Sequence, residues 1–99
     1  MKTREVMVAR IYLSEQDGRA DELMRTLHDD YGIRGVTVFR GISGFGDSRR
    51  IHASRLLDLS LDLPIVLEFF DAREKVERCL DGLELAPGHC LTWMARVND

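Results

Sequence analysis

Apolar residues recur along this chain with two alternating periods, which predict strands and helices in turn. From Val6 to Leu13 apolar side chains occupy both faces, as is typical of a central strand. The next apolar residues have the spacing of one helical face: Ala20, Leu23, Met24, Leu27 and Tyr31. Gly32 follows them as a natural helix stop. The first third of the chain is therefore predicted to be a strand followed by a helix of about three turns.

The remaining two thirds repeat this alternation. Strands are predicted at Gly35–Ile42 and Ile65–Phe70, the latter introduced by Pro64. Asp71 with Glu74 resembles a helix capping pair. The helix that it opens has one apolar face: Val76, Cys79, Leu80 and Leu83. A last strand begins at Cys90 and carries alternating apolar residues: Leu91, Trp93, Ala95 and Val97.

The segment from Asp47 to Asp62 fits two structures. Its leucines alternate with polar residues at strand period, whereas Ile51, Arg55 and Leu59 share one helical face. Its conformation is left open. Outside it, the order of elements in a chain of 99 residues predicts one α+β domain over residues 1–99. We expect a ferredoxin-like βαββαβ sandwich, with a four-stranded antiparallel sheet and two helices on one face.

Such a sheet has a second face without helices. The residues assigned to the helix-covered face are all apolar: Met7, Ala9, Ile11, Leu13, Ile65, Leu67, Phe69, Leu91, Trp93 and Ala95. The opposite face mixes apolar residues with charges: Val6, Val8, Tyr12, Val66, Phe70, Met94, Arg10, Glu68 and Arg96. A sheet face with this many apolar residues is unlikely to remain exposed to water. The charged residues on it could form ion pairs with another subunit across an interface. The sequence predicts a closed, symmetric oligomer.

Charge and composition narrow the class of protein. With 44% hydrophobic and 31% charged residues the composition is that of a globular domain, and a formal charge of −3 argues against a nucleic-acid partner. No apolar run reaches the length of a membrane span, and the N-terminus lacks a signal-peptide pattern. The two cysteines are far apart and outside any metal or redox spacing. A cytoplasmic protein is expected.

A glycine-rich loop is the strongest chemical feature. Between Arg40 and Arg55 the chain has four arginines and one acid, a local charge of +3. The glycines of Gly41-Ile42-Ser43-Gly44-Phe45-Gly46 allow backbone N–H groups to surround an anion. Arg49 and Arg50 follow with donors suited to phosphate. No metal spacing, nucleophile elbow or carboxylate pair is evident, so no catalytic residue is assigned and the protein is expected not to be an enzyme.

The chain resembles the PII signalling proteins, and most closely a family of small PII-like proteins of uncharacterised function. The motifs that carry the likeness run from the second strand to the third: Thr37-Val38-Phe39-Arg40-Gly41, Gly44-Phe45-Gly46, Ile51-His52, Leu59-Ser60 and Asp62-Leu63-Pro64. The resemblance extends from Arg10 to Val97. It implies a homotrimer that binds an adenine nucleotide (AMP, ADP or ATP) between subunits and uses no catalytic cofactor. It also implies a mobile effector loop at about residues 41–55, which signals to a partner such as a membrane transporter or channel.

The resemblance also implies the nucleotide-binding residues. Gly35 and Thr37 match positions near the adenine, and Glu68 and Phe70 match positions lining the cleft. The root of the effector loop and the turn before the last strand supply the others: Gly44, Phe45, Gly46, Gly88 and His89. Arg49 and Arg50 are added from the loop itself.

Two departures from PII proteins change the expected ligand. His89 stands where PII proteins have a phosphate-binding lysine, and the C-terminal arginines that clamp phosphates are absent. Because a histidine is only partly charged at neutral pH, a nucleotide with fewer phosphates is favoured. The alternative function is a metal-binding trimer resembling the divalent-cation tolerance proteins, with His52, His89 and Cys90 as the candidate ligands.

Overall fold

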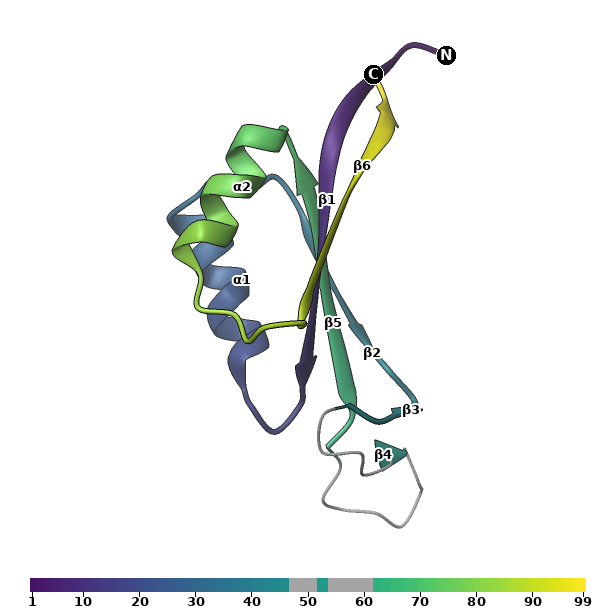
Figure 1. Cartoon of the computed structure of the whole chain (residues 1–99), viewed down its shortest axis with the longest axis vertical. Helices are drawn as coiled ribbons and strands as arrows, with labels where there is room; N and C mark the ends of the chain where they lie inside the picture. The colour runs from purple at the N-terminus through teal and green to yellow at the C-terminus, as the bar shows by residue number, and fades with distance from the viewer. Residues whose placement is uncertain (47–51, 54–61) are drawn as a thin grey trace.

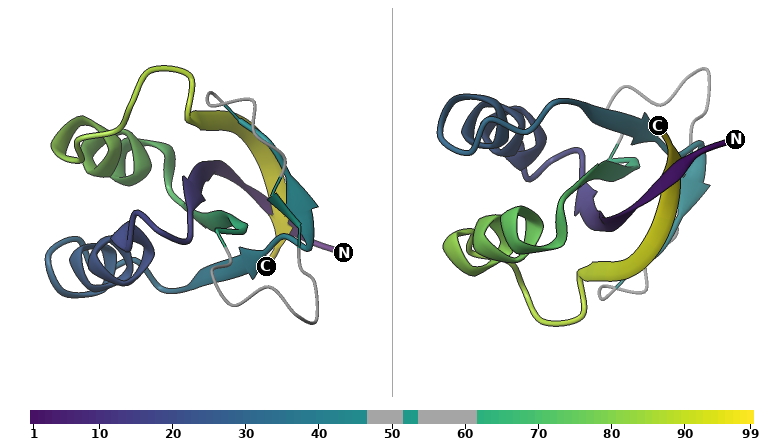
Figure 2. Two further views of the ribbon diagram at one scale, coloured as in Figure 1. Left: turned by 90° about the horizontal axis from the view of Figure 1, so that it is seen from below. Right: turned by 90° about the horizontal axis from the view of Figure 1, so that it is seen from above.

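An antiparallel sheet covered on one face by two helices forms the body of the molecule (Figure 1). The computed structural model describes residues 1–46, 52–53 and 62–99. The sheet has the strand order β2–β5–β1–β6, with these bounds: β1 (Thr3–Ser14), β2 (Val36–Arg40), β5 (Pro64–Asp71) and β6 (Cys90–Asn98). Helices α1 (Arg19–Asp29) and α2 (Arg73–Gly82) lie side by side (Figure 2). The predicted ferredoxin-like α+β fold is confirmed.

The two ends of the sheet differ. At one end, the lower in Figure 1, the short strands β3 (Ser43–Gly44) and β4 (His52–Ala53) form a separate ladder. At the other end, β1 and β6 extend past the helices and carry the two termini. Most of the segment whose conformation the sequence left open lies outside the described residues. Among the described helices, none has the length and apolarity that crossing a bilayer requires.

The core lies between the helices and the sheet. Its buried residues come from β1, β5 and both helices, together with Ile33: Met7, Ala9, Ile11, Leu23, Leu27, Ile33, Leu67, Phe69, Val76 and Cys79. The odd-numbered positions of β1 and β5 point to this side, as their alternation predicts. Burial of this apolar surface is the main driving force for the fold.

The faces of β6 were predicted wrongly. In the register of β1 and β6, Trp93 lies opposite Val8 and Leu91 opposite Arg10. Directly opposed residues share a face, so Leu91, Trp93 and Ala95 lie on the face without helices. Met94, assigned to that face, instead lies opposite the core residue Met7. β6 is an edge strand, where few apolar contacts fix which alternation faces inward.

The face without helices, here called the open face, is consequently more apolar than the sequence predicted. Val6 and Val8 on this face are buried within the single chain. Exposed large side chains surround them on all four strands: Tyr12, Phe39, Phe70, Leu91 and Trp93. This extent of exposed aromatic surface is typical of an interface rather than of a solvated sheet.

The helix starts also differ from expectation. The N-cap of α2 is Ala72, and no side chain caps the helix. Asp71 ends β5; its Oδ1 accepts the Ala72 N–H at 2.8 Å, and its Oδ2 lies 3.4 Å from Lys75 Nζ. The predicted pairing of Asp71 with Glu74 is therefore wrong, because the strand continues one residue further than its apolar run.

Helix α1 ends at Asp29, and Gly32 follows with a φ of 62°.

The cysteines allow a direct test of the core. Burial raises the pKa of the Cys79 thiol, and burial also raises that of the partly exposed Cys90. A raised pKa leaves less of the reactive thiolate at pH 8. In a Cys90→Ser variant, we expect iodoacetamide to leave Cys79 unmodified in the native state and to modify it in urea, as measured by mass spectrometry. Rapid native labelling of Cys79 would contradict this placement.

Candidate functional site

The residues expected to bind nucleotide fall into two cavities at opposite ends of the sheet. The loop-end cavity, about 550 Å³, lies at the end that carries β3 and β4, and contains Gly44, Phe45, Gly46, Gly88 and His89. The terminal cavity, about 970 Å³, lies at the end that carries the chain termini, and contains Gly35, Thr37, Glu68 and Phe70. Arg49 and Arg50 lie outside the described residues. One chain thus brings together five of the expected residues at one end and four at the other.

The loop-end cavity owes its shape to Pro64 and two glycines. Gly41 donates its N–H to the Pro64 carbonyl at 2.8 Å, so the chain leaving β2 lies directly against the start of β5. A Cβ on Gly41 would come within 2.6 Å of Pro64 Cγ, and one on Gly44 within 3.1 Å. The glycines of this motif are therefore explained in part by close packing.

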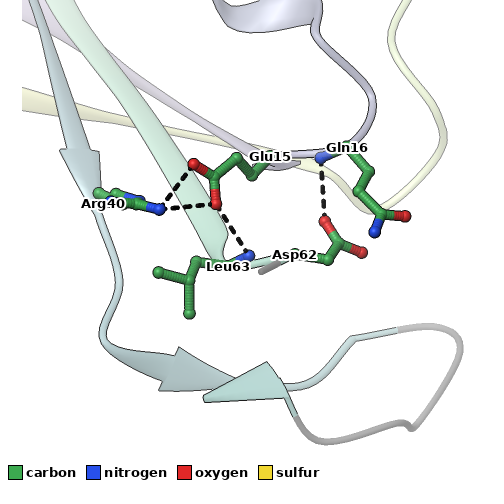
Figure 3. Close-up of polar contacts among 5 residues, drawn as sticks. All are labelled: Glu15, Gln16, Arg40, Asp62 and Leu63. Carbon is green, nitrogen blue, oxygen red and sulfur yellow. Dashed lines mark hydrogen bonds and ion pairs between the residues drawn. The ribbon is translucent and has the colours of Figure 1, made fainter. Parts of the chain in front are cut away.

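Both ends of the loop that follows β2 are tied to the segment after β1 (Figure 3). On the β2 side, Arg40 Nη2 lies 2.8 and 3.0 Å from the two carboxylate oxygens of Glu15. On the β5 side, Asp62 Oδ1 accepts the Gln16 N–H at 3.0 Å. Leu63 donates its N–H to Glu15 Oε2 at 3.4 Å, and its carbonyl accepts the Glu15 N–H at 2.9 Å. The residues on either side of this loop are therefore bonded to the same short segment, Glu15 and Gln16.

The turn before β6 forms another wall of the loop-end cavity. Gly88 has a φ of 81°, in the left-handed region that glycine adopts most readily. The next residue, His89, accepts the Tyr12 N–H at its carbonyl, and its Nδ1 lies 3.3 Å from the Tyr12 carbonyl. Since a carbonyl can only accept, Nδ1 carries the proton in this contact. The imidazole is thereby oriented at the cavity.

The described lining of the loop-end cavity is more acidic than is usual for a phosphate site. It contains the carboxylates of Asp17 and Asp62 as well as His89 and Tyr12. Among the described lining residues there is no lysine or arginine. Asp62 belongs to the motif Asp62-Leu63-Pro64, but the sequence analysis assigned it no binding role. Asp17 and Glu15 lie in a polar loop after a strand and had no motif to indicate them.

In the terminal cavity, Glu68 belongs to a charged cluster on the open face. Arg10 lies across from it in β1, with Nη2 2.7 Å and Nε 2.9 Å from Glu68 Oε1. The hydrogen bond to Glu68 raises the pKa of Arg10. The same guanidinium stacks over Trp93, 5.2 Å from the ring centre. The sequence placed Glu68 among charges suited to pairing across an interface, and the structure pairs it with Arg10 of its own chain. This ion pair does not exclude the ligand contact that the resemblance implies for Glu68.

Two glycines are not explained by the chain itself. No described atom lies within 4 Å of a Cβ built on Gly35 or Gly46, and neither has a positive φ. An alanine at either position would be compatible with the described fold and would stabilise it through the unfolded state. Gly35 lines the terminal cavity and Gly46 the loop-end cavity. Within the described part of the chain, glycine at both positions leaves the backbone exposed to the cavity that it lines.

The described geometry does not support the alternative function, a metal-binding trimer. His89 and Cys90 are neighbours in sequence, and the His52 side chain is outside the described set. Within ranges 1–46 and 62–99, no three histidine, cysteine or carboxylate side chains are grouped as a metal site requires.

Comparison with known proteins assigns most of the chain to one group. The family described as "DUF190: Uncharacterized ACR, COG1993" matches residues 6–98. A UPF0166 protein of Aquifex aeolicus (strain VF5) is 38% identical over 95 residues, which are 96% of either chain. A UPF0166 protein of Methanocaldococcus jannaschii is 35% identical over 80 residues, covering 77% of this chain and 73% of the relative.

Solved structures share the fold at lower identity. CPII from Thiomonas intermedia K12, described as a nitrogen regulatory PII-like protein bound to ADP, AMP and bicarbonate, superposes with a TM-score of 0.76. It is 19% identical, and the match covers 99% of this chain and 92% of that one. Another structure of CPII, bound to ADP and bicarbonate, gives a TM-score of 0.74 at 21% identity, covering 99% and 93%.

Proposed function

Because this chain belongs to the DUF190 family, and because its fold is that of PII-like proteins, we propose that it is a regulatory protein that binds an adenine nucleotide. The nucleotide lies between subunits of a homotrimer, where the loop-end cavity of one subunit meets the terminal cavity of the next. CPII is described as bound to ADP and AMP. This likeness supports an adenine nucleotide here.

The separation of the two cavities is the observation that carries the proposal. Both cavities border β5, the loop-end cavity at Pro64 and the terminal cavity from Glu68 to Asp71. At about 3.3 Å per residue, the four steps from Pro64 to Glu68 span roughly 13 Å. The two cavities of one chain are therefore separate openings at different ends of the sheet. Each cavity has one glycine at which the described residues would leave room for a side chain: Gly35 in the terminal cavity and Gly46 in the loop-end cavity. Two cavities from different subunits, brought together, account for both glycines.

The apolar open face supports the assembly. In one subunit its aromatic residues are exposed around the Arg10–Glu68 pair. Contact with other copies through this face removes that surface from water and brings the ends of neighbouring sheets together. We propose the trimer on this ground and on the resemblance to PII proteins.

The loop of residues 41–55 is the proposed output of the protein. Its root, Gly44 to Gly46, lines the loop-end cavity, so a ligand there contacts the loop directly. A ligand that binds one loop conformation more tightly than another shifts the population toward it. The partner that reads the loop is proposed to be a membrane transporter or channel. The role is regulatory, not catalytic, and we propose that it is exercised in the cytoplasm.

Isothermal titration of the purified protein with AMP, ADP, ATP and adenosine tests this function. We expect at least one of the nucleotides to bind. Because a histidine is only partly charged at neutral pH, His89 in the loop-end cavity predicts tighter binding of AMP or ADP than of ATP. Absence of binding by all four, from a protein shown to be folded by circular dichroism, would contradict the proposed function.

A subunit complementation experiment tests where the nucleotide lies. Gly35→Ala and Gly46→Ala should each weaken binding about tenfold or more, because an added methyl group obstructs a tightly fitted ligand. When the two variants are unfolded together and refolded as a mixture, about one quarter of the intersubunit sites combine two unmodified cavities. Tight sites at that fraction support the proposal.

The outcomes of this mixing experiment are distinct. A site within one chain gives no tight sites in the mixture, because each chain has one altered glycine. Gly41→Ala is the matched control for loop structure, since its Cβ meets Pro64. We expect it to lower the free energy of unfolding by about 1–3 kcal/mol, whereas the other two alanine variants should leave it unchanged or raise it slightly.

A further inference from the structure

Two side chains of opposite charge, one in each cavity, have no bonded partner within the described residues. Arg34 lines the terminal cavity and Asp17 lines the loop-end cavity. Both are exposed, and neither has a hydrogen bond or ion pair to any described residue. Unpaired charges are common on a protein surface. These two differ from the usual case because they line the two cavities that the proposed assembly brings together.

Most other charged side chains that line these cavities are already engaged. Those of the terminal cavity are paired within the chain: Glu68 with Arg10, Asp71 with Lys75, and Asp99 with Arg4. In the loop-end cavity, Asp62 accepts the Gln16 N–H at 3.0 Å. Folding of the described chain thus leaves a guanidinium in one cavity and a carboxylate in the other, each able to form a new ion pair without losing an existing one.

We propose that Arg34 of one subunit forms an ion pair with Asp17 of the next subunit. The proposal rests on the function proposed above, in which the terminal cavity of one subunit meets the loop-end cavity of its neighbour, and it names a contact that holds them together. Arg34 lies just before β2, and Asp17 lies in the turn between β1 and α1. A planar guanidinium with paired N–H donors fits both oxygens of a carboxylate.

This contact reconciles the acidic lining of the loop-end cavity with a nucleotide ligand. A guanidinium of the next subunit beside Asp17 offsets the negative charge of that carboxylate, so a phosphate in the same cavity is repelled less. The ion pair does not use the backbone at Gly35 or Gly46, which remains available to the ligand. The neighbouring subunit then contributes charge as well as shape to the site.

A charge-reversal cycle tests the contact. Arg34→Glu sets two carboxylates against each other, and Asp17→Arg sets two guanidinium groups against each other. Because like charges across an interface oppose association, each single variant should raise the protein concentration at half-assembly by about tenfold or more in sedimentation equilibrium. The double variant exchanges the two charges and should return to within about threefold of the wild type. Both positions are exposed, so the variants are expected to fold, which circular dichroism checks.

Arg25→Glu is the matched control. Arg25 is an exposed arginine on α1 that lines neither of the two cavities, and its reversal changes the net charge by the same amount as Arg34→Glu. We expect it to shift half-assembly by less than about twofold. When combined with Asp17→Arg, it should not restore assembly. Restoration by Arg25→Glu would show that only the overall charge matters and would overturn the proposal.

Three other results would also overturn the contact. A double variant that assembles no better than the single variants excludes an ion pair between Arg34 and Asp17. Rescue of Asp17→Arg by Arg49→Glu or Arg50→Glu, and not by Arg34→Glu, would place the partner of Asp17 in the loop. If Arg34→Glu assembles normally but loses affinity for AMP and not for adenosine, Arg34 acts on the ligand instead of on the neighbouring subunit.

The proposed function and this inference can fail separately. If the wild type assembles and binds AMP while Arg34→Glu leaves assembly unchanged, the nucleotide site stands and the contact is wrong. If the wild type sediments as a monomer at micromolar concentration, the proposed assembly fails, and the contact fails with it.

Discussion

Replacing Phe69 with alanine is expected to lower the free energy of unfolding by about 3–5 kcal/mol, a large fraction of the stability of a small domain. Phe69 is 1% exposed and lies in β5 between β1 and β2, in the same buried cluster as Leu27 and Val76. Its removal leaves a cavity that the surrounding strands and helices cannot fill by small shifts. Urea denaturation followed by circular dichroism measures the change.

The adjacent phenylalanine is the matched control. Phe70 is 44% exposed and points to the open face. In a single subunit, Phe70→Ala should cost much less than Phe69→Ala. If the open face is an interface, the cost of Phe70→Ala should also depend on protein concentration, because assembly stabilises the folded state by mass action. Equal and concentration-independent losses in the two variants would contradict the placement of the two faces.

Replacing Leu91 with arginine is expected to dissociate the assembly. Leu91 is 50% exposed on the open face, directly opposite Arg10 in the register of β1 and β6. The new guanidinium would lie next to that of Arg10, so the proposed interface would contain two adjacent positive charges. Such a juxtaposition of like charges weakens association by several kcal/mol. Sedimentation equilibrium should change from an oligomer to a monomer, and nucleotide binding should be lost with it.

Met94→Arg is the control for this experiment. Met94 lies in the same strand with a similar exposure of 42%, but it lies opposite Met7, on the face toward the helices. We expect this variant to remain assembled. Dissociation by Met94→Arg with no effect of Leu91→Arg would reverse the assignment of the two faces of β6. A wild-type protein that sediments as a monomer at micromolar concentration would reject the assembly itself.

The sequence by itself determined the order of elements, the fold and the family. Strand and helix periods differ, and the apolar residues of β1, β5, α1 and α2 follow them over enough positions to identify each element. The motif Gly44-Phe45-Gly46 and the run from Asp62 to Pro64 carry the family resemblance locally. Local patterns of this kind need no knowledge of distant contacts.

Only the tertiary structure decided which side of β6 faces the helices. Both alternations of this edge strand contain apolar residues, and pairing with the distant strand β1 at the other end of the sequence selects one of them. The same applies to the capping of α2, because β5 continues through Asp71 against Met7. Hydrogen bonding between distant strands thus overrides a local signal.

The arrangement of the candidate site was also decided by tertiary structure. The motifs identified the residues but not that Gly35 and Gly46 lie at opposite ends of the sheet, since their distance depends on the direction of β2. The partner of Glu68 was likewise not identified by the sequence, because Arg10 meets it only through the pairing of β1 with β5. Charge pairing is a property of residues brought together by folding, and the linear order of the chain does not encode it in any local pattern.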